Sequence, residues 1–340
     1  MRVSNNRPRH LRVRLAAIFF AVAIASLAVA AQTPGLRLVS TAWPPFTNPP
    51  GHARFALDLV EAALTRINVS STTSIVEADA FTQALVSGPY DGSAAAWRDG
   101  ARERALIFSQ PYLENRLVLV ARSGGDVTAR QLTDLKGKRI AIVGGYSYGD
   151  TVELTGPTFV RSKTEEDSLR MLLASEVDYT LMDEVVVEYI LTHHEAEAKA
   201  RLQLGRTALL TRPLYLAIRR SRPDAQSIVD RFNAQLRGMI ADRTYHKLLH
   251  VDWINADVDG DGRTEYVPST DQVGKLPPLR AYTLITPEAQ PQRRVEIAPG
   301  YYIGGKFYNA WTDVPDEFKA GSGRPSADRS TASVFTFVWK

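Results

Sequence analysis

Short apolar segments alternate with amphipathic helical patterns along residues 36–250, and this alternation restricts the fold more than any other feature. The segments "LRLVS", "RLVLVAR" and "RIAIV" predict buried strands, and "ARFALDLVEAALTRI" predicts a helix with one apolar face. Strands that alternate with helices build open, mostly parallel sheets covered by helices. We therefore expect an α/β fold.

Two further helices are predicted along the chain, and the amino-acid composition changes after residue 250. Thr164 precedes a helical pattern with Asp167 three residues on, which is near the spacing of a capping box. Residues 224–249 carry apolar side chains at helical spacing and predict one long helix. Residues 251–340 are rich in Pro and Gly and have few helical runs, so they predict an appended β-rich or irregular extension.

Residues 1–31 have the layout of a secretory signal peptide. Five arginines precede an apolar stretch from Leu15 to Ala31 that ends in small residues. A membrane anchor is the alternative, but about 17 apolar residues, many of them Ala, lie at the short limit for spanning a bilayer. We expect a periplasmic protein with no stable membrane insertion after cleavage.

Charge and cysteine content exclude some functions. The formal charge of the whole chain is +4, but residues 1–31 hold five Arg and no Asp or Glu, so the remainder carries −1. The excess of positive charge therefore lies in the predicted signal peptide, residues 1–31. We expect no nucleic-acid partner for the rest of the chain. The absence of cysteine excludes disulfides and thiolate chemistry.

Six landmarks in order resemble the extracellular solute-binding proteins of family 3, the periplasmic polar amino-acid-binding subunits of ABC transporters. They are "AWPPF", "FALDLVEAAL", "YDG" with "ARERALIFSQPY", "DLKGKRIAIVGGYSYGD", "LLASEVDYTLMDE" and "MIADRTYHKLL". The resemblance covers about residues 36–250 and implies a type II periplasmic binding protein. In that Venus-flytrap fold, two α/β lobes joined by two crossover strands close on a ligand.

The resemblance also implies a division of the chain. Lobe 1 would comprise residues 32–121 and 213–250, lobe 2 residues 122–212, and the extension residues 251–340. The two crossings would fall near residues 120–125 and 209–214.

Two charged residues are implied as ligand contacts. The family places an arginine six residues before the Phe of "FSxPY", which selects Arg102 as the partner of the ligand carboxylate. Asp183, at the end of a predicted strand, takes the position that binds the ligand ammonium. The alternatives are a solvated helix arginine for Arg102 and a helix N-cap for Asp183.

Other landmarks imply the walls of the pocket. Trp43 and Phe46 stand where the family places an aromatic ring over the ligand, and ordinary core packing is the alternative. Tyr146 and Ser147 lie at a Gly-started helix N-terminus, which favours a carboxylate. Where the family carries small hydroxyl residues before the arginine, this chain has Ala95, Trp97 and Asp99. The indole of Trp97 shrinks the cavity and favours a small, planar or apolar ligand.

A separate motif, "DVDGDGRTE", lies in the extension. Asp257, Asp259, Asp261 and Glu265 occupy positions 1, 3, 5 and 9 of a calcium-loop pattern, but Pro268 stands where position 12 carries Glu. A short calcium-binding loop and a plain acidic turn both fit this pattern. No other cofactor is expected.

The expected function is capture of a small solute, an amino acid or a similar compound, and its delivery to an ABC permease or other membrane partner. A ligand-binding sensor or accessory subunit of a periplasmic system is one alternative. A periplasmic dehydratase of the cyclohexadienyl type is another, with Asp99 and Asp183 as the cleft acids. Because the sequence contains none of the common hydrolase, metalloprotease or phosphate-binding motifs, we expect a protein that is not an enzyme.

Overall fold

The structure is a computed structural model that describes residue 1 and residues 35–193, 200–258, 264–275, 282–283, 300–303 and 306–316. Residues 2–34, which hold nearly all of the predicted signal peptide, lie outside the described residues. Among the residues that are described, no helix has the length and apolar character needed to cross a membrane.

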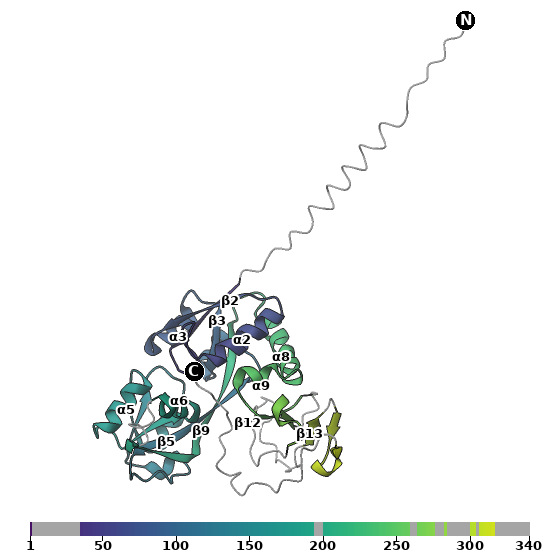
Figure 1. Cartoon of the computed structure of the whole chain (residues 1–340). Coiled ribbons are helices and arrows are strands. Elements are labelled where there is room, and N and C mark those ends of the chain that lie inside the picture. Colours follow the sequence, from purple (N-terminus) through teal and green to yellow (C-terminus); the bar gives the residue numbers. More distant parts are fainter. Residues whose placement is uncertain are drawn as a thin grey trace. The chain divides into compact units, whose positions relative to one another are not determined.

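A mixed sheet, nine-stranded among the described residues, is the framework of residues 36–250 (Figure 1). Its order is β2-β1-β3-β9-β5-β8-β6-β7, with β4 paired to β9. The strands are β1 (Leu36–Thr41), β2 (Ser71–Val76), β3 (Gly92–Trp97), β4 (Leu106–Phe108), β5 (Leu113–Arg122), β6 (Arg139–Val143), β7 (Thr158–Ser162), β8 (Tyr179–Asp183) and β9 (Leu202–Arg219).

The strand directions differ from the mostly parallel sheet that the sequence predicts. β1 runs parallel to β2 and β3, and β6 runs parallel to β7 and β8. However, β9 pairs antiparallel with β3, β4 and β5, and β5 pairs antiparallel with β8. The two long strands at the centre therefore join two parallel halves into one mixed sheet.

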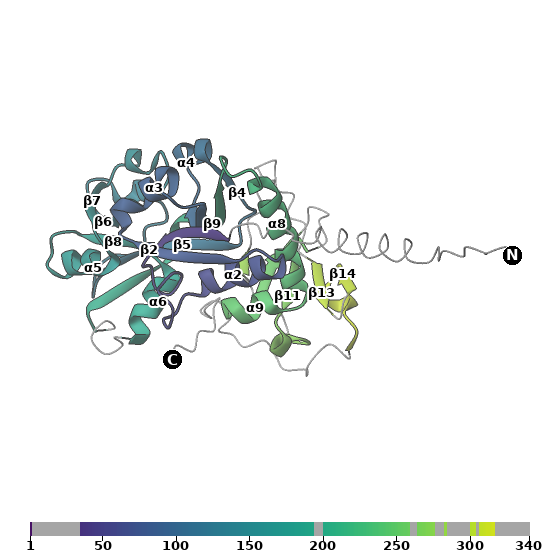
Figure 2. The same cartoon turned by 90° about the horizontal axis from the view of Figure 1, so that it is seen from above.

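Helices cover both halves of the sheet. They are α2 (Phe55–Arg66), α3 (Ala78–Ser87), α4 (Gly100–Ala105), α5 (Glu165–Leu173), α6 (Glu184–His193), α8 (Ala225–Ala241) and α9 (Thr244–Leu249). α2, α8 and α9 pack together, whereas α5 and α6 lie against β5, β6 and β8 (Figures 1 and 2). The predicted cap of α5 is confirmed, because the Thr164 hydroxyl accepts a hydrogen bond from the Asp167 amide at 3.1 Å.

The predicted helix over residues 224–249 is in fact two helices. Its apolar positions are buried as expected, from Ile228 to Ile240. The helix ends at Ala241, and Arg243 adopts a left-handed conformation with φ of 69° before α9 begins. A left-handed residue cannot continue a right-handed helix, so the periodic pattern spans a break that it does not reveal.

β5 and β9 pair along most of their length, from Leu113 with Leu214 to Arg122 with Leu202. The first predicted crossing, near residues 120–125, begins at the end of β5. The second, near residues 209–214, lies entirely within β9. Register shifts interrupt the pairing around Val118, where a bulge increases local twist. The bounds of lobe 1 and lobe 2 themselves stay a prediction.

The extension forms a β-sheet where it is described, which is the first of the two alternatives that the sequence predicts. Its sheet has the order β12-β10-β11-β13-β14. The strands are β10 (Trp253–Ala256), β11 (Glu265–Pro268), β12 (Tyr282–Thr283), β13 (Gly300–Ile303) and β14 (Lys306–Tyr308). One link to α9 is a hydrogen bond of 2.9 Å between Nε2 of the buried His246 and the Val267 carbonyl.

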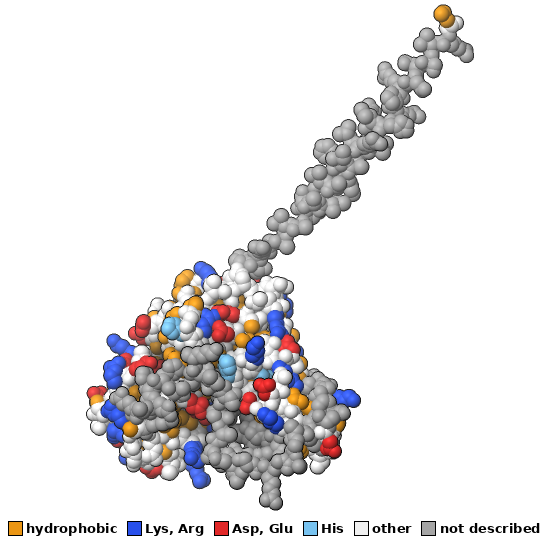
Figure 3. All heavy atoms as spheres, viewed as in Figure 1, with side chains coloured by type: hydrophobic (Ala, Val, Ile, Leu, Met, Phe, Trp, Pro, Cys, Tyr) orange, Lys and Arg blue, Asp and Glu red, His pale blue; other side chains and the backbone are white. Residues whose placement is uncertain are grey.

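Acidic and basic side chains are interspersed on the face of the molecule shown in Figure 3. Lys and Arg do not gather into one continuous patch among the described residues of that face.

Candidate functional site

A cavity of about 430 Å³ opens between residues of the predicted lobe 1 and residues of the predicted lobe 2. Lobe 1 contributes Thr82, Asp99 and Arg102, and lobe 2 contributes the segment 145–150 together with residues of the following turn. The volume lies within the range of small-molecule sites. Polar groups from both lobes therefore face one space large enough for a small solute.

Arg102 lies on α4, and its guanidinium is held by protein groups on several sides. Nη1 donates to the Trp97 carbonyl at 2.9 Å, and Nη2 donates to the Thr82 hydroxyl at 2.8 Å and to the Gly145 carbonyl at 3.3 Å. Nε lies 3.5 Å from the Asp99 carboxylate. The residue is 2% exposed, so the sequence-based alternative of a solvated arginine is wrong.

Asp99 is the N-cap of α4 and the anion beside Arg102. Its carboxylate accepts from the Arg102 amide at 2.7 Å and from the Ser147 hydroxyl of lobe 2. Burial opposes ionisation of Asp99, but these hydrogen bonds and the Arg102 charge hold its pKa below the usual value. An internal carboxylate thus already occupies one side of the arginine.

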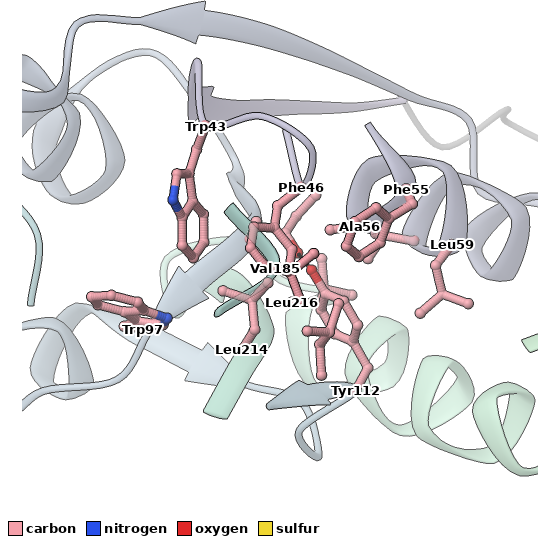
Figure 4. Packing of buried hydrophobic residues seen from close by; sticks show 14 of the residues in the cluster. Trp43, Phe46, Phe55, Ala56, Leu59, Trp97, Tyr112, Val185, Leu214 and Leu216 are labelled. Carbon is pink, nitrogen blue, oxygen red and sulfur yellow. Dashed lines mark hydrogen bonds between the residues drawn. The ribbon is translucent and has the colours of Figure 1, made fainter. Parts of the chain in front are cut away.

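Four aromatic rings meet beside this pair, and Figure 4 shows the indoles of Trp43 and Trp97 facing the same space. The centroid of Trp97 lies 5.5 Å from that of Trp43, 5.7 Å from Tyr146 and 5.5 Å from Tyr148, each in an edge-to-face arrangement. These four residues are called the aromatic cluster below. The cavity next to them, lined also by Arg102, has about 30 Å³, the share of one water molecule.

Phe46 lies behind this cluster, with its ring centroid 4.4 Å from that of Trp43. It is fully buried and also packs against Phe55 of α2 at 4.9 Å. Since it lines neither cavity described above, the structure gives Phe46 a packing role.

Asp183 ends β8 and sits at the start of α6. Its carboxylate accepts from the amides of Val185 at 2.8 Å and Arg116 at 3.0 Å, and from Nδ2 of Asn115 at 3.2 Å. Asn115 in turn accepts from the Trp97 indole at 2.7 Å. Burial raises the pKa of Asp183 to about 8. The helix-capping alternative is therefore confirmed by these contacts, and a contact with a ligand stays a prediction.

Glu165 is a residue that the sequence reading missed. It is the first residue of α5, is 8% exposed, and its carboxyl hydrogen-bonds with the Tyr146 hydroxyl. Burial raises its pKa to about 8, and the nearby Glu166 and Asp183 charges act in the same direction. An acidic residue in the first turn of a helix is ordinary in a sequence, so only the fold reveals this burial.

The acidic loop of the extension is only partly described. Asp259 and Asp261 lie outside the described residues, while Glu265 is buried and accepts a hydrogen bond from the Val258 amide at 3.0 Å. No group of three or more metal-binding side chains occurs in the described part of the chain. Calcium binding by Asp257, Asp259, Asp261 and Glu265 stays a prediction.

The structure thus gathers most of the predicted site at one place. Trp43, Trp97, Arg102, Tyr146 and Ser147 line one or both cavities. Asp183 reaches them by hydrogen bonds through Asn115 and Trp97, and Glu265 belongs to β11 of the extension sheet.

The sequence matches one family model. Residues 38–256 match the bacterial extracellular solute-binding proteins, family 3. A comparison with curated proteins found no match.

Solved structures with the same fold include an ancestral arginine-binding protein bound to arginine. It is 23% identical, with a TM-score of 0.54, and the match covers 64% of this chain and 97% of that one. An arginine transport-system periplasmic binding protein from Legionella pneumophila is 23% identical with a TM-score of 0.53, covering 64% and 98%. An ancestral amino-acid-binding protein, a precursor of cyclohexadienyl dehydratase, is 20% identical with a TM-score of 0.51, covering 63% and 93%. These likenesses confirm the two-lobed fold.

Proposed function

Because the chain belongs to the bacterial extracellular solute-binding proteins, family 3, we propose that it captures an amino acid or a similar small solute between its lobes. The proposal includes export by a cleaved signal peptide, residence in the periplasm, and delivery of the solute to an ABC permease. The basic and apolar residues 1–31 support export.

The cavity between Arg102 and the segment 145–150 is the observation that carries this proposal. It joins a buried guanidinium and a carboxylate on lobe 1 to hydroxyl groups on lobe 2. A zwitterionic solute needs both kinds of partner once water leaves the cleft. Arg102 remains the proposed contact of a solute carboxylate, with Tyr146 and Ser147 opposite.

Calorimetric titration of the mature protein tests this function. The titrants are the twenty amino acids, small amines and small carboxylates, at neutral pH. We expect at least one titrant to bind with a Kd in the micromolar range or below, and to raise the thermal unfolding temperature by mass action. Absence of any binding across the whole panel would contradict the proposal.

The Arg102→Ala substitution tests the site. It removes the group that connects Thr82, Trp97 and Gly145 and leaves the Asp99 carboxylate without its cation. We expect the affinity for the bound titrant to fall at least tenfold, about 1.4 kcal/mol or more.

Arg104→Ala is the matched control, since Arg104 lies on the same helix but is exposed. Its affinity should equal that of the unchanged protein. Equal affinities in the Arg102 and Arg104 variants would remove Arg102 from the site.

The family match bears differently on the two alternative functions, a dehydratase and a sensor or accessory subunit. A dehydratase gains no support from a family of solute-binding proteins, and no catalytic step is proposed. A sensor or accessory role for the extension stays a prediction, because the family match ends at residue 256.

A further inference from the structure

Glu165 is a buried acid with no cationic partner among its described contacts. Its carboxyl accepts from its own backbone N–H and hydrogen-bonds with the neutral Tyr146, and the charged groups that face it are the acidic side chains of Glu166 and Asp183. An ionised carboxylate in such a place is costly unless a positive charge comes close. The site therefore holds a neutral carboxyl whose ionisation becomes favourable only when a cation arrives.

The charges that line the cavity are otherwise matched. Asp99 pairs with Arg102, and Glu153 pairs with Arg161. Asp150 is a further acid of the lining, but it faces the guanidinium of Arg212, whose carbon lies 6.0 Å from the centroid of the Trp97 ring. A solute carboxylate must compete with Asp99 for Arg102, and a solute ammonium must find its anion beyond these pairs, at Glu165.

One residue of the aromatic cluster, Tyr146, connects Glu165 to the cavity. Tyr146 lines both cavities and hydrogen-bonds with Glu165, and its hydroxyl lies 3.4 Å from the Thr41 hydroxyl of lobe 1. The faces of Trp and Tyr rings attract cations, and a tyrosine oxygen can accept from an ammonium while its hydrogen bonds to a carboxylate. Tyr146 can therefore connect a bound ammonium to the buried acid.

Resting on the proposed function, we propose that the cleft selects solutes with a positively charged amine, and that Glu165 determines this selectivity through Tyr146. The solute carboxylate contributes less, because Asp99 already occupies its partner. Glu165 is a positioning residue, since it acts on the solute through the tyrosine.

Binding of such a cation is coupled to proton release. Glu165 is mostly protonated at pH 7, because burial raises its pKa to about 8. A bound ammonium favours the carboxylate, so the proton leaves to solvent when the amine binds. Asp183 titrates in the same range, while burial raises the pKa values of Tyr146 and Tyr148 well above it and keeps both tyrosines neutral.

Four probes of similar length separate the contributions of amine and carboxylate: L-lysine, cadaverine, L-norleucine and hexanoate. Calorimetry at pH 7, in phosphate and in Tris, gives the affinity of each probe and the number of protons released. We expect lysine and cadaverine to bind within about tenfold of each other with release of close to one proton, and hexanoate not to bind. Norleucine retains an α-ammonium, so it should also bind with proton release. Binding of hexanoate as tight as that of lysine, or tight binding of lysine or cadaverine without proton release, overturns the inference but leaves the proposed function standing. No binding by any of the four probes overturns the inference, whereas the proposed function fails only if the whole panel of titrants fails to bind.

The Glu165→Gln variant assigns the effect, with Glu176→Gln as control, because Glu176 is an exposed glutamate that is not among the groups facing Glu165. Gln retains the shape of the neutral carboxyl, so both variants should unfold at the temperature of the unchanged protein. We expect Glu165→Gln to lower cadaverine affinity at least tenfold and to abolish proton release, while Glu176→Gln leaves both unchanged. Unchanged proton release in Glu165→Gln overturns the role of this residue.

Discussion

Trp97 occupies volume beside Arg102 that a larger solute would need. Its ring contacts Trp43, Tyr146 and Tyr148, and its indole N–H donates to Asn115. We expect Trp97→Ala to lower the free energy of unfolding by about 3–5 kcal/mol, since the substitution leaves a cavity and deprives Asn115 of its donor. Urea unfolding followed by circular dichroism measures the change.

Trp97→Phe is the control, because it retains a ring and loses only the N–H. Trp97→Phe should lower the free energy of unfolding by clearly less than Trp97→Ala does. A Trp97→Ala loss below about 1 kcal/mol would show that the indole is not tightly packed.

At the scale of residues, motif spacing located Arg102 but could not show its partners. The count from Phe108 selected a buried arginine from three candidates in the sequence, and the alternative of a solvated side chain was wrong. Its pairing with Asp99 and the burial of Glu165 depend on contacts between segments far apart in the chain. Such contacts are not visible in local periodicity.

At the scale of elements, His246 links α9 to the extension sheet. Its Nε2 bonds to the Val267 carbonyl, and burial lowers its pKa to about 4, although that hydrogen bond opposes the shift. Between about pH 6.5 and 4, His246 is therefore protonated in the unfolded chain but neutral in the folded chain. We expect the free energy of unfolding to fall as the pH drops through this range, on the order of 3 kcal/mol from this group.

The His246→Gln variant isolates this contribution. Urea unfolding at several pH values should show a weaker decrease in stability below pH 6.5 than in the unchanged protein. Two parallel pH profiles would contradict the assignment to His246.

Strands and helices with a clear hydrophobic pattern were predicted correctly, whereas the break between two consecutive helices was not. "RIAIV" corresponds to β6 because a strand with parallel neighbours on both sides is apolar throughout. The break at Arg243 escaped prediction, since apolar spacing continues from α8 into α9. The antiparallel centre of the sheet was also missed, because periodicity carries no information on strand direction.

At the scale of the whole molecule, Gly145 permits the close approach of the lobes. Its φ is +79°, and a Cβ atom there would lie 2.1 Å from the carbonyl oxygen of Ala78 on α3. Gly145→Ala should therefore hold the lobes apart and lower solute affinity at least tenfold. Small-angle X-ray scattering should show a larger radius of gyration than in the unchanged protein.

Gly144→Ala is the matched control, since its added Cβ would meet no atom closer than 3.4 Å. It should leave both the scattering and the affinity unchanged. Identical scattering from all three proteins would contradict the role of Gly145 in closure.

The two-lobed architecture was predicted because six landmarks occur in a fixed order along residues 36–250. The family match over residues 38–256 and the shared fold confirm it. The arrangement of the extension could not be predicted, since its short strands pair across long sequence separations, as β11 does with β13. Parallel pairing of that kind leaves no local signature.

The aromatic cluster also gives this protein an optical property. Trp43 and Trp97 lie with their ring centroids 5.5 Å apart and contact Tyr146 and Tyr148, which line the cavity proposed for the solute. Near-ultraviolet circular dichroism depends on the fixed packing of such rings. Occupancy of the cleft should therefore be readable as a change in ellipticity and in tryptophan emission, with no label attached to solute or protein.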